Sequence, residues 1–245
     1  MNSPGHTPGL FITGTDTGVG KTIVTGTIVT ALMAHGINPG VMKPIVTGMD
    51  EQRVGLPDSE WLTTITGLCD PPDLVSPYRF RAAAAPLIAA THEGQTIAPS
   101  RIMQAFHALS ARHDCVVVEG IGGVMVPITP GFFVADMAKQ MGLPVVIVAR
   151  AGLGSINHTL LTVDCLRNRG VAIGGLIFNQ TTRPTSVPDE SDTVQTILRL
   201  SGLRSFGELP SCEGLPTAWP THRDTLIARL DVQGLLETMG VRGTA

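Results

Sequence analysis

Apolar residues along this chain follow two alternating patterns. Short unbroken apolar runs, rich in β-branched residues, predict strands buried on both faces of a sheet at 10–13, 41–46, 115–119, 144–150, 173–179 and 206–209. Longer stretches with apolar residues at helical spacing predict helices at 21–35, 100–112, 134–141, 156–169, 193–200 and 225–239. Strands that alternate with helices are typical of parallel sheets with right-handed crossovers. The pattern therefore predicts an α/β fold, with a three-layer, mostly parallel β-sheet flanked by helices.

Two segments interrupt this alternation, 49–57 and the proline-rich 70–86. Loops of this length in a compact domain are often functional. The chain has 245 residues, of which 43% are apolar, and this is enough to bury a sizeable core. Because α/β folds of this length often remain undivided, we expect one domain spanning 1–245.

The composition narrows the classes of partner. The formal net charge is −3 and the isoelectric point is near 6.1, so electrostatics gives no reason to expect nucleic acid or an anionic membrane. No apolar run approaches the ~20 residues of a membrane-spanning helix, and the first residues lack the pattern of a signal peptide. The four cysteines lie far apart, which argues against structural zinc and a disulfide framework. These features predict a cytoplasmic protein.

The segment 14–22, GTDTGVGKT, follows the first predicted strand and opens the first predicted helix. A glycine-rich turn in this position is typical of the phosphate loop of a nucleoside triphosphatase, because its N–H groups and the helix N-terminus attract an anion. Lys21 is expected to reach the outer phosphates, and the Thr22 hydroxyl to ligate Mg²⁺. Five residues separate Gly14 from Gly20, one more than in the generic pattern. The alternative interpretation is a turn that merely ends in Gly-Lys-Thr.

Polar residues mark the ends of the other predicted strands, where ligands bind to open parallel sheets. Lys43 and Thr47 lie at the end of the second strand, and Lys43 is either a clamp on transferring charge or a solvated strand-end lysine. Glu119 closes the third strand, where an unpaired carboxylate is costly to bury, so we expect it to help hold Mg²⁺. Asp58 is the natural second carboxylate, or a helix N-cap.

Two later strand ends indicate further contacts. The Asn179 carboxamide carries the paired donor and acceptor that match an adenine edge, or it caps a turn. Gly152 and Gly154 form a plain turn, or they expose the N–H groups of the following helix to a substrate carboxylate. His158, one turn into that helix, is interpreted as a packing or surface residue rather than a base.

Five motifs taken together resemble the dethiobiotin synthetase family. They are Gly-Thr-Asp-Thr-x-Val-Gly-Lys-Thr at 14–22, Lys-Pro-x-x-(Ser/Thr)-Gly at 43–48, Val-Glu-Gly-x-Gly-Gly at 118–123, Gly-x-Ile-Asn-His at 154–158 and Gly-Glu-(Ile/Leu)-Pro at 207–210. The resemblance implies a fold of the P-loop NTPase type and an ATP-dependent cyclo-ligase of biotin biosynthesis. Such an enzyme converts 7,8-diaminopelargonate, CO₂ and ATP into dethiobiotin, ADP and phosphate through a carbamate and a carbamoyl phosphate, with Mg²⁺ and as a homodimer.

The resemblance also implies roles for individual residues. The catalytic lysines correspond to Lys21 and Lys43, and the Mg²⁺ ligands to Thr22, Asp58 and Glu119. The ATP-binding positions correspond to Thr17, Gly18, Val19, Gly20, Lys21, Thr22, Ile23, Asp58, Glu119, Gly120, Ile121, Gly122, Asn179, Gln180, Pro210, Ser211 and Cys212. The substrate-binding positions correspond to Thr47 and, at the interface between the two subunits, to Gly154, Ser155, Ile156 and Asn157. Gly18 replaces a Glu that some relatives carry, and 211–217 matches the family poorly.

A second class of protein shares the same expected fold, the P-loop switch ATPases that position DNA or membrane-bound partners. Such proteins typically carry a lysine just after the first loop glycine, where this chain has Thr15. They also need a basic or amphipathic surface, and the predicted helix at 225–239 has balanced charges. A glutamine-dependent amide-forming relative would need a further glutaminase domain. The sequence therefore favours the synthetase over both alternatives.

Overall fold

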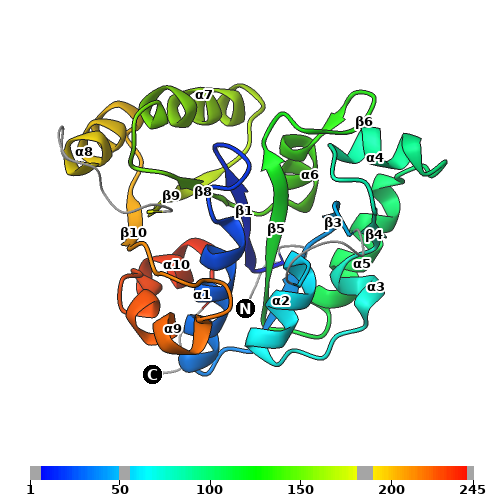
Figure 1. Ribbon diagram of the computed structural model, residues 1–245, viewed down its shortest axis with the longest axis horizontal. Coiled ribbons are helices and arrows are strands. Elements are labelled where there is room, and N and C mark those ends of the chain that lie inside the picture. Colours follow the sequence, from blue (N-terminus) through cyan, green and yellow to red (C-terminus); the bar gives the residue numbers. More distant parts are fainter. Residues whose placement is uncertain (1–6, 50–55, 181–189, 242–245) are drawn as a thin grey trace.

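The computed structural model describes residues 7–49, 56–180 and 190–241, and its centre is a six-stranded sheet (Figure 1). The strands lie in the order β10-β9-β8-β1-β5-β2, and every neighbouring pair is parallel. Their bounds are β1 (Gly9–Gly14), β2 (Pro39–Met42), β5 (Cys115–Gly123), β8 (Val145–Ala149), β9 (Ile173–Asn179) and β10 (Ser205–Leu209). The predicted parallel sheet is confirmed.

Helices cover both faces of this sheet and complete the three layers. One face packs against α1 (Lys21–Ala34), α2 (Asp58–Thr66), α9 (Trp219–Ile227) and α10 (Val232–Met239). The other face packs against α4 (Pro86–His92), α5 (Pro99–Ser110), α6 (Val134–Met141), α7 (Ser155–Asn168) and α8 (Glu190–Ser201). In Figure 1, α1, α9 and α10 lie together at the lower left, beside the central strands.

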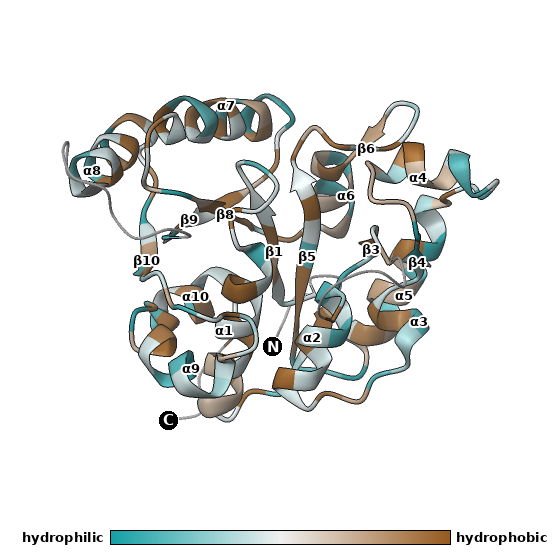
Figure 2. Ribbon diagram, viewed as in Figure 1, coloured by the Kyte–Doolittle hydropathy of each residue, from teal (hydrophilic) through white to brown (hydrophobic). Residues whose placement is uncertain are grey.

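The unbroken apolar runs follow from burial on both faces. In β1, Phe11 contributes to one core cluster, whereas Leu10 and Ile12 contribute to the other, and none of the three is exposed. The same alternation holds in β5 and β8, so successive side chains of a strand enter opposite cores. Figure 2 shows the result as strands that are brown along most of their length.

The prediction of one continuous strand at 41–46 is wrong. The strand β2 ends at Met42, and β3 (Ile45–Val46) pairs instead with β4 (Tyr78–Arg79) in a separate two-stranded sheet. Pro44 has no N–H for a sheet ladder, and the Lys43 N–H donates to the carbonyl of Val75 at 2.9 Å. The chain therefore turns away from the main sheet at Lys43.

Three other expectations need correction. The predicted helix at 225–239 is two helices, α9 and α10, because the Asp231 side chain accepts from the Gly234 N–H and starts α10 anew. The predicted loop at 70–86 contains α3 (Pro72–Val75) and β4, and the strand predicted at 115–119 continues to Gly123. A short hairpin of β6 (Pro127–Thr129) and β7 (Phe132–Phe133) was not predicted. Most of the predicted loop at 49–57, residues 50–55, lies outside the described residues.

Within the described ranges, no helix is long and apolar enough to span a bilayer. The parallel strands all point in one direction, so the segments that follow β1, β2, β8, β9 and β10 meet at one edge of the sheet.

Candidate active site

The phosphate loop joins β1 to α1, as predicted. Its glycines are needed for local reasons, since Gly18 has φ 74° and Gly20 has φ 88°. A Cβ on Gly14 would lie only 2.7 Å from Val19 Cγ2 and 3.0 Å from Lys21 Nζ. The loop therefore folds back tightly over the end of β1 and brings Lys21 across it.

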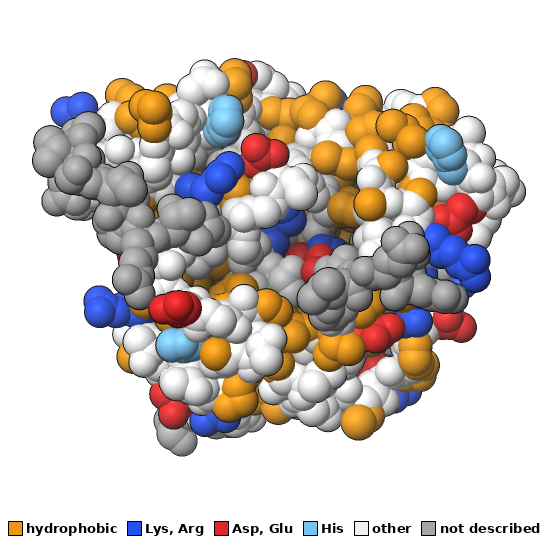
Figure 3. Space-filling view, viewed as in Figure 1, with side chains coloured by type: hydrophobic (Ala, Val, Ile, Leu, Met, Phe, Trp, Pro, Cys, Tyr) orange, Lys and Arg blue, Asp and Glu red, His pale blue; other side chains and the backbone are white. Residues whose placement is uncertain are grey.

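A cleft of about 380 Å³ opens beside this loop. It is lined by Thr17, Gly18, Gly20, Lys21, Thr22, Lys43, Val46, Thr47, Asp58, Glu119, Ile121 and Gly122. Figure 3 shows a hollow near the centre of this face in which basic and acidic side chains lie together. The cleft thus collects the residues predicted for phosphate, metal and catalysis, together with Thr47.

The strand β5 is irregular where it enters the cleft. Ile12 of β1 pairs with Glu119, but Gly14 pairs with Gly123, so β5 contributes two more residues than β1 over this stretch. Such an irregularity bends a strand and redirects its side chains. It follows Glu119 directly and places Ile121 and Gly122 in the wall of the cleft.

Lys43 holds the two carboxylates of the cleft. Its Nζ forms an ion pair with Glu119 Oε1, donates to the Gly120 carbonyl at 3.1 Å, and lies 3.2 Å from Asp58 Oδ2. Burial opposes the charge of Lys43, but Glu119 and Asp58 outweigh it, so the pKa of Lys43 is raised above the ordinary value of lysine. Lys43 is therefore held in its charged form between two carboxylates.

The two carboxylate oxygens of Glu119 differ in their hydrogen bonding. Oε1 accepts from Lys43 and from the Thr22 hydroxyl, at 2.9 Å in the second case. Oε2 is buried and has no hydrogen-bond partner among the described residues, in a side chain that is 0% exposed. A buried carboxylate oxygen without a partner is costly, so this atom is suited to bind a cation that the protein itself does not supply.

Lys21 lies deeper than a typical lysine, and its Nζ donates to the Asp16 carbonyl at 3.0 Å. Burial and the neighbouring charge of Lys43 lower the pKa of Lys21 from 10.5 to about 8, against the opposite effect of Glu119, Asp58 and Asp16. A bound anion would stabilise the charged form of Lys21 and raise its pKa again.

Asn179 lies against the phosphate loop. It ends β9, is 6% exposed, and its Nδ2 donates to the Val19 carbonyl at 3.0 Å. A Cβ on Gly20 would collide with the same Nδ2, so the loop and the carboxamide fit closely. The sequence predicts Asn179 as an adenine contact, whereas the structure shows that its nitrogen already holds the loop.

The other residues predicted for adenine lie beside Asn179. Asn179 pairs with Leu209 across the sheet, and the Gln180 N–H donates to the Leu209 carbonyl at 2.9 Å. Pro210 follows directly, and Ser211 and Cys212 continue the chain as half-buried residues. The ends of β9 and β10 therefore bring this predicted group together.

The predicted substrate residues at the start of α7 are not in the cleft. Gly154 has φ 86° and precedes α7, and Asn157 is exposed. A neighbouring cavity of about 350 Å³ is lined by Thr15, Asp16, Gly123, Val124, Met125, His158, Leu161, Thr162 and Cys165. Of the predicted substrate residues, only Thr47 lines either cavity.

The interpretation of Asp58 as an N-cap is wrong. Pro57 is the N-cap of α2, and Asp58 is the first residue of that helix, with its carboxylate directed at Lys43. Sequence reasoning also missed Ser76, whose buried hydroxyl donates to the Lys43 carbonyl at 2.6 Å. Nothing in the local pattern around Ser76 indicated this contact, because it joins residues 33 positions apart.

Comparisons with known proteins agree with this geometry. The family model described as an AAA domain matches residues 8–218. The ATP-dependent dethiobiotin synthetase BioD of Anaeromyxobacter dehalogenans (strain 2CP-C) is 44% identical over 203 residues, which cover 82% of this chain and 89% of the relative. The protein of the same name from Thermodesulfovibrio yellowstonii is 36% identical over 241 residues, which cover 93% of this chain and 98% of the relative.

Solved structures match the fold at lower identity. The MinC:MinD cell division protein complex of Aquifex aeolicus gives a TM-score of 0.61 at 15% identity, over 97% of this chain and 98% of that one. The septum site-determining protein MinD complexed with Mg-ADP, from Pyrococcus horikoshii OT3, gives 0.54 at 16% identity, over 95% and 94%. At these identities the likeness shows the fold alone.

Proposed function

This chain belongs to the dethiobiotin synthetase family, and on that basis we propose that its cleft converts 7,8-diaminopelargonate, CO₂ and ATP into dethiobiotin, ADP and phosphate. The protein is an ATP-dependent ligase of biotin biosynthesis. The observation that best supports the proposal is that a phosphate loop, two lysines and two carboxylates line the same cleft. The proposed reaction needs no covalent intermediate with the enzyme.

The proposed reaction has three steps. One amine of the substrate attacks CO₂ and loses a proton, which gives a carbamate. A carbamate oxygen attacks the γ-phosphorus of ATP and ADP leaves. The second amine then attacks the carbonyl carbon, releases phosphate and a proton, and closes the five-membered ureido ring. Lys21 and Lys43 offset the charge that develops on the transferring phosphoryl group, so catalysis is mostly positioning and charge stabilisation.

We propose that Thr22, Asp58 and Glu119 hold Mg²⁺ with the nucleotide. Their oxygens are the ligand type that Mg²⁺ prefers, and the unpartnered Oε2 of Glu119 supports the assignment. The ion would shield charge on the outer phosphates. Lys43 pairs with both carboxylates, so its single positive charge offsets part of their negative charge, and a bound cation would offset the rest.

We further propose a homodimer in which the start of α7 reaches the substrate. Large apolar side chains are exposed around this helix: Met125 at 48%, Leu153 at 109% and Leu161 at 61%. An exposed apolar cluster beside a cavity is typical of an interface. The backbone N–H groups at Gly154, Ser155 and Ile156, together with Asn157, would then hold the substrate carboxylate at the boundary between subunits. The Ser155 N–H donates to the Gly152 carbonyl at 3.1 Å, so it would have to exchange that partner for the substrate. The four free thiols support the cytoplasm as the compartment.

The test is ADP release from the purified protein with ATP, Mg²⁺ and bicarbonate, with and without 7,8-diaminopelargonate. We expect release that depends on the diamine, with dethiobiotin formed in equal amount. ATP hydrolysis that ignores the diamine and responds to DNA or lipid vesicles would instead identify a switch ATPase, the alternative that shares this fold.

A further inference from the structure

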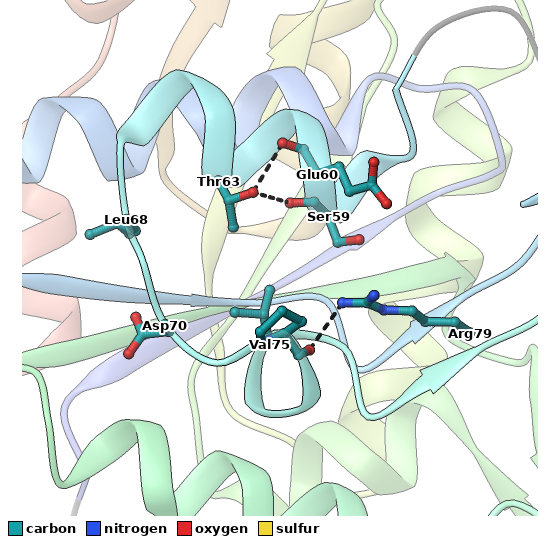
Figure 4. Close-up of a pocket in the computed structure, with 8 residues that line it drawn as sticks. Ser59, Glu60, Thr63, Leu68, Asp70, Val75 and Arg79 are labelled. Carbon is teal, nitrogen blue, oxygen red and sulfur yellow. Dashed lines mark hydrogen bonds between the residues drawn. The ribbon is translucent and has the colours of Figure 1, made fainter.

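A third cavity, of about 330 Å³, lies between α2, α3 and β4 (Figure 4). We call it the α2 cavity, and its lining residues are Ser59, Glu60, Thr63, Leu68, Asp70, Pro72, Val75 and Arg79. It shares none of these residues with the active-site cleft. The two sites adjoin at the first turn of α2, where Asp58 lines the cleft and Ser59 lines the α2 cavity. They also adjoin at Val75, whose carbonyl accepts from the Lys43 N–H at 2.9 Å.

Ser59 gives the first sign of a ligand. The residue is 2% exposed, and its Oγ has no hydrogen-bond partner among the described residues. Thr63 on the same wall differs, because its hydroxyl donates to the carbonyls of Ser59 and Glu60 at 3.2 and 3.0 Å. In Figure 4 the Ser59 hydroxyl points away from α2, toward Arg79. A buried hydroxyl without a partner is costly, and a polar occupant would relieve that cost.

Opposite charges on the walls give the second sign. Glu60 and Arg79 both line the cavity, and the ion pairs found among the described residues do not join them. Arg79 Nη2 donates to the Pro72 carbonyl at 3.1 Å, which fixes the guanidinium on its wall. In the view of Figure 4, the Ser59 hydroxyl lies between the Glu60 carboxylate and the Arg79 guanidinium.

The remaining lining restricts what can bind. Both oxygens of Asp70 are occupied, by Arg112 Nε at 2.9 Å and by His113 Nε2 at 2.8 Å, so Asp70 has little left for a ligand. Leu68 and Val75 supply apolar surface. An ion of one sign would meet a like charge on one wall, whereas a molecule with both charges can pair with both walls.

We propose that the α2 cavity binds a small aliphatic amino carboxylate. Its ammonium group pairs with Glu60, its carboxylate pairs with Arg79 and accepts from the Ser59 hydroxyl, and its alkyl chain packs on Leu68 and Val75. The volume of about 330 Å³ is in the range of small-molecule pockets.

Binding in the α2 cavity is coupled to the cleft. Ser59 directly follows Asp58, and Asp58 Oδ2 lies 3.2 Å from Lys43 Nζ. An occupant that orders the first turn of α2 changes the equilibrium position of Asp58, and by reciprocity nucleotide binding changes the affinity of the occupant. This consequence rests on the proposed function of the cleft, whereas the binding itself does not.

The test is isothermal titration calorimetry of the full chain without nucleotide, with L-norleucine as the probe. Hexanoate lacks its amine and 1-aminopentane lacks its carboxylate, so they are the one-charge controls. We expect norleucine to bind about tenfold more tightly than either control. Glu60→Gln should reduce norleucine to the affinity of hexanoate, and Arg79→Gln to that of 1-aminopentane.

Two further variants distinguish the loss of a ligand contact from the loss of folded protein. Ser59→Ala removes a buried hydroxyl without a partner, so it should not lower the midpoint of thermal unfolding and should still weaken norleucine binding. Thr64→Ala is the matched control, because Thr64 is exposed on α2 and does not line the cavity. Equal binding of norleucine and hexanoate, no binding at millimolar concentration, or unchanged binding in Glu60→Gln and Arg79→Gln would each overturn the site. Norleucine binding that leaves the calorimetric affinity for Mg²⁺-ATP unchanged would overturn the coupling.

Discussion

Asn179→Ala separates two roles that this side chain can have. The predicted role is contact with adenine, and the structure adds a second, because Asn179 Nδ2 donates to the Val19 carbonyl at 3.0 Å. Val19 is fully buried and Asn179 is 6% exposed, so water cannot replace the lost donor easily. We therefore expect the variant to bind even a base-free triphosphate more weakly, since the phosphate loop loses the contact that holds it.

The magnitude follows from the burial of both groups. A buried carbonyl that loses its partner costs about 1–3 kcal/mol. If this free-energy cost acts entirely on phosphate binding by the loop, the affinity for phosphates falls by about 5- to 150-fold. Any part of the cost that does not weaken phosphate binding lowers the free energy of unfolding instead. Urea denaturation of the same samples measures that loss.

The assay is calorimetry with Mg²⁺-tripolyphosphate, which has no base, beside Mg²⁺-ATP. The loss on tripolyphosphate measures the hold on the loop, and any additional loss on ATP measures base recognition. Gln180→Ala is the control for tripolyphosphate alone, because Gln180 is adjacent and half-buried and its backbone bond to Leu209 does not need the side chain. As a residue predicted for adenine, Gln180 is not a control for ATP. Tripolyphosphate binding within twofold of the unmodified protein, with ATP binding reduced, would refute the reasoning.

Three further predictions concern the cleft, and a fourth concerns the proposed interface at α7. Lys43→Ala should retain ATP binding and lose most turnover, and unchanged turnover would contradict the proposed role. Because Glu119 loses its buried cation, urea denaturation should also show a free energy of unfolding lowered by about 3–5 kcal/mol. Glu119→Gln should raise the Mg²⁺ concentration for half-maximal rate about tenfold or more, as a metal titration measures, because a carboxylate ligand is removed. As pH rises through about 8, Lys21 loses its proton, and the affinity of the free protein for ATP should fall by up to about tenfold per pH unit. Lys21→Arg should abolish this fall, because the guanidinium stays charged. Leu161→Asp should give a monomer by light scattering with reduced turnover, whereas Ile88→Asp, at a similarly exposed leucine-sized side chain on α4, should change neither.

The sequence predicts the main sheet well because burial on both faces leaves an unmistakable pattern. Val145–Ala149 is an unbroken apolar run, and all its residues are fully buried. The helix α2, by contrast, has no clear apolar pattern, and the sequence indicates it only through the interpretation of Asp58 as an N-cap. It carries threonines with low helix propensity, and its Trp61 and Leu62 are buried through tertiary contacts. Thr63 and Thr66 direct their hydroxyls back to carbonyls of the helix. Packing, rather than local preference, therefore makes this segment helical.

The candidate site was predicted as residue types, and its connections were not. Glycine, lysine and carboxylate at successive strand ends indicate a nucleotide cleft, because parallel strands deliver their ends to one edge. The ion pair of Lys43 with Glu119 joins residues 76 positions apart, and the bond from Asn179 to Val19 spans 160 positions. Contacts at such separations depend on the register of the sheet and on the irregularity of β5, which no local pattern encodes.

The nucleotide cleft is therefore held together by the side chains that are expected to bind its ligands. Lys43 and Asp58 form an ion pair between α2 and the end of β2, and Asn179 ties the end of β9 to the phosphate loop. The same α2 places Trp61 against Trp219, with ring centroids 5.3 Å apart, and Trp61 Nε1 donates to the Pro216 carbonyl at 3.3 Å. This connects α2 to the chain that follows the predicted adenine residues after β10. Because each of these groups has a partner within the protein, a substitution changes the shape of the cleft as well as a ligand contact. Kinetic loss alone cannot distinguish the two effects, whereas binding of a fragment that lacks the contacted part of the ligand can.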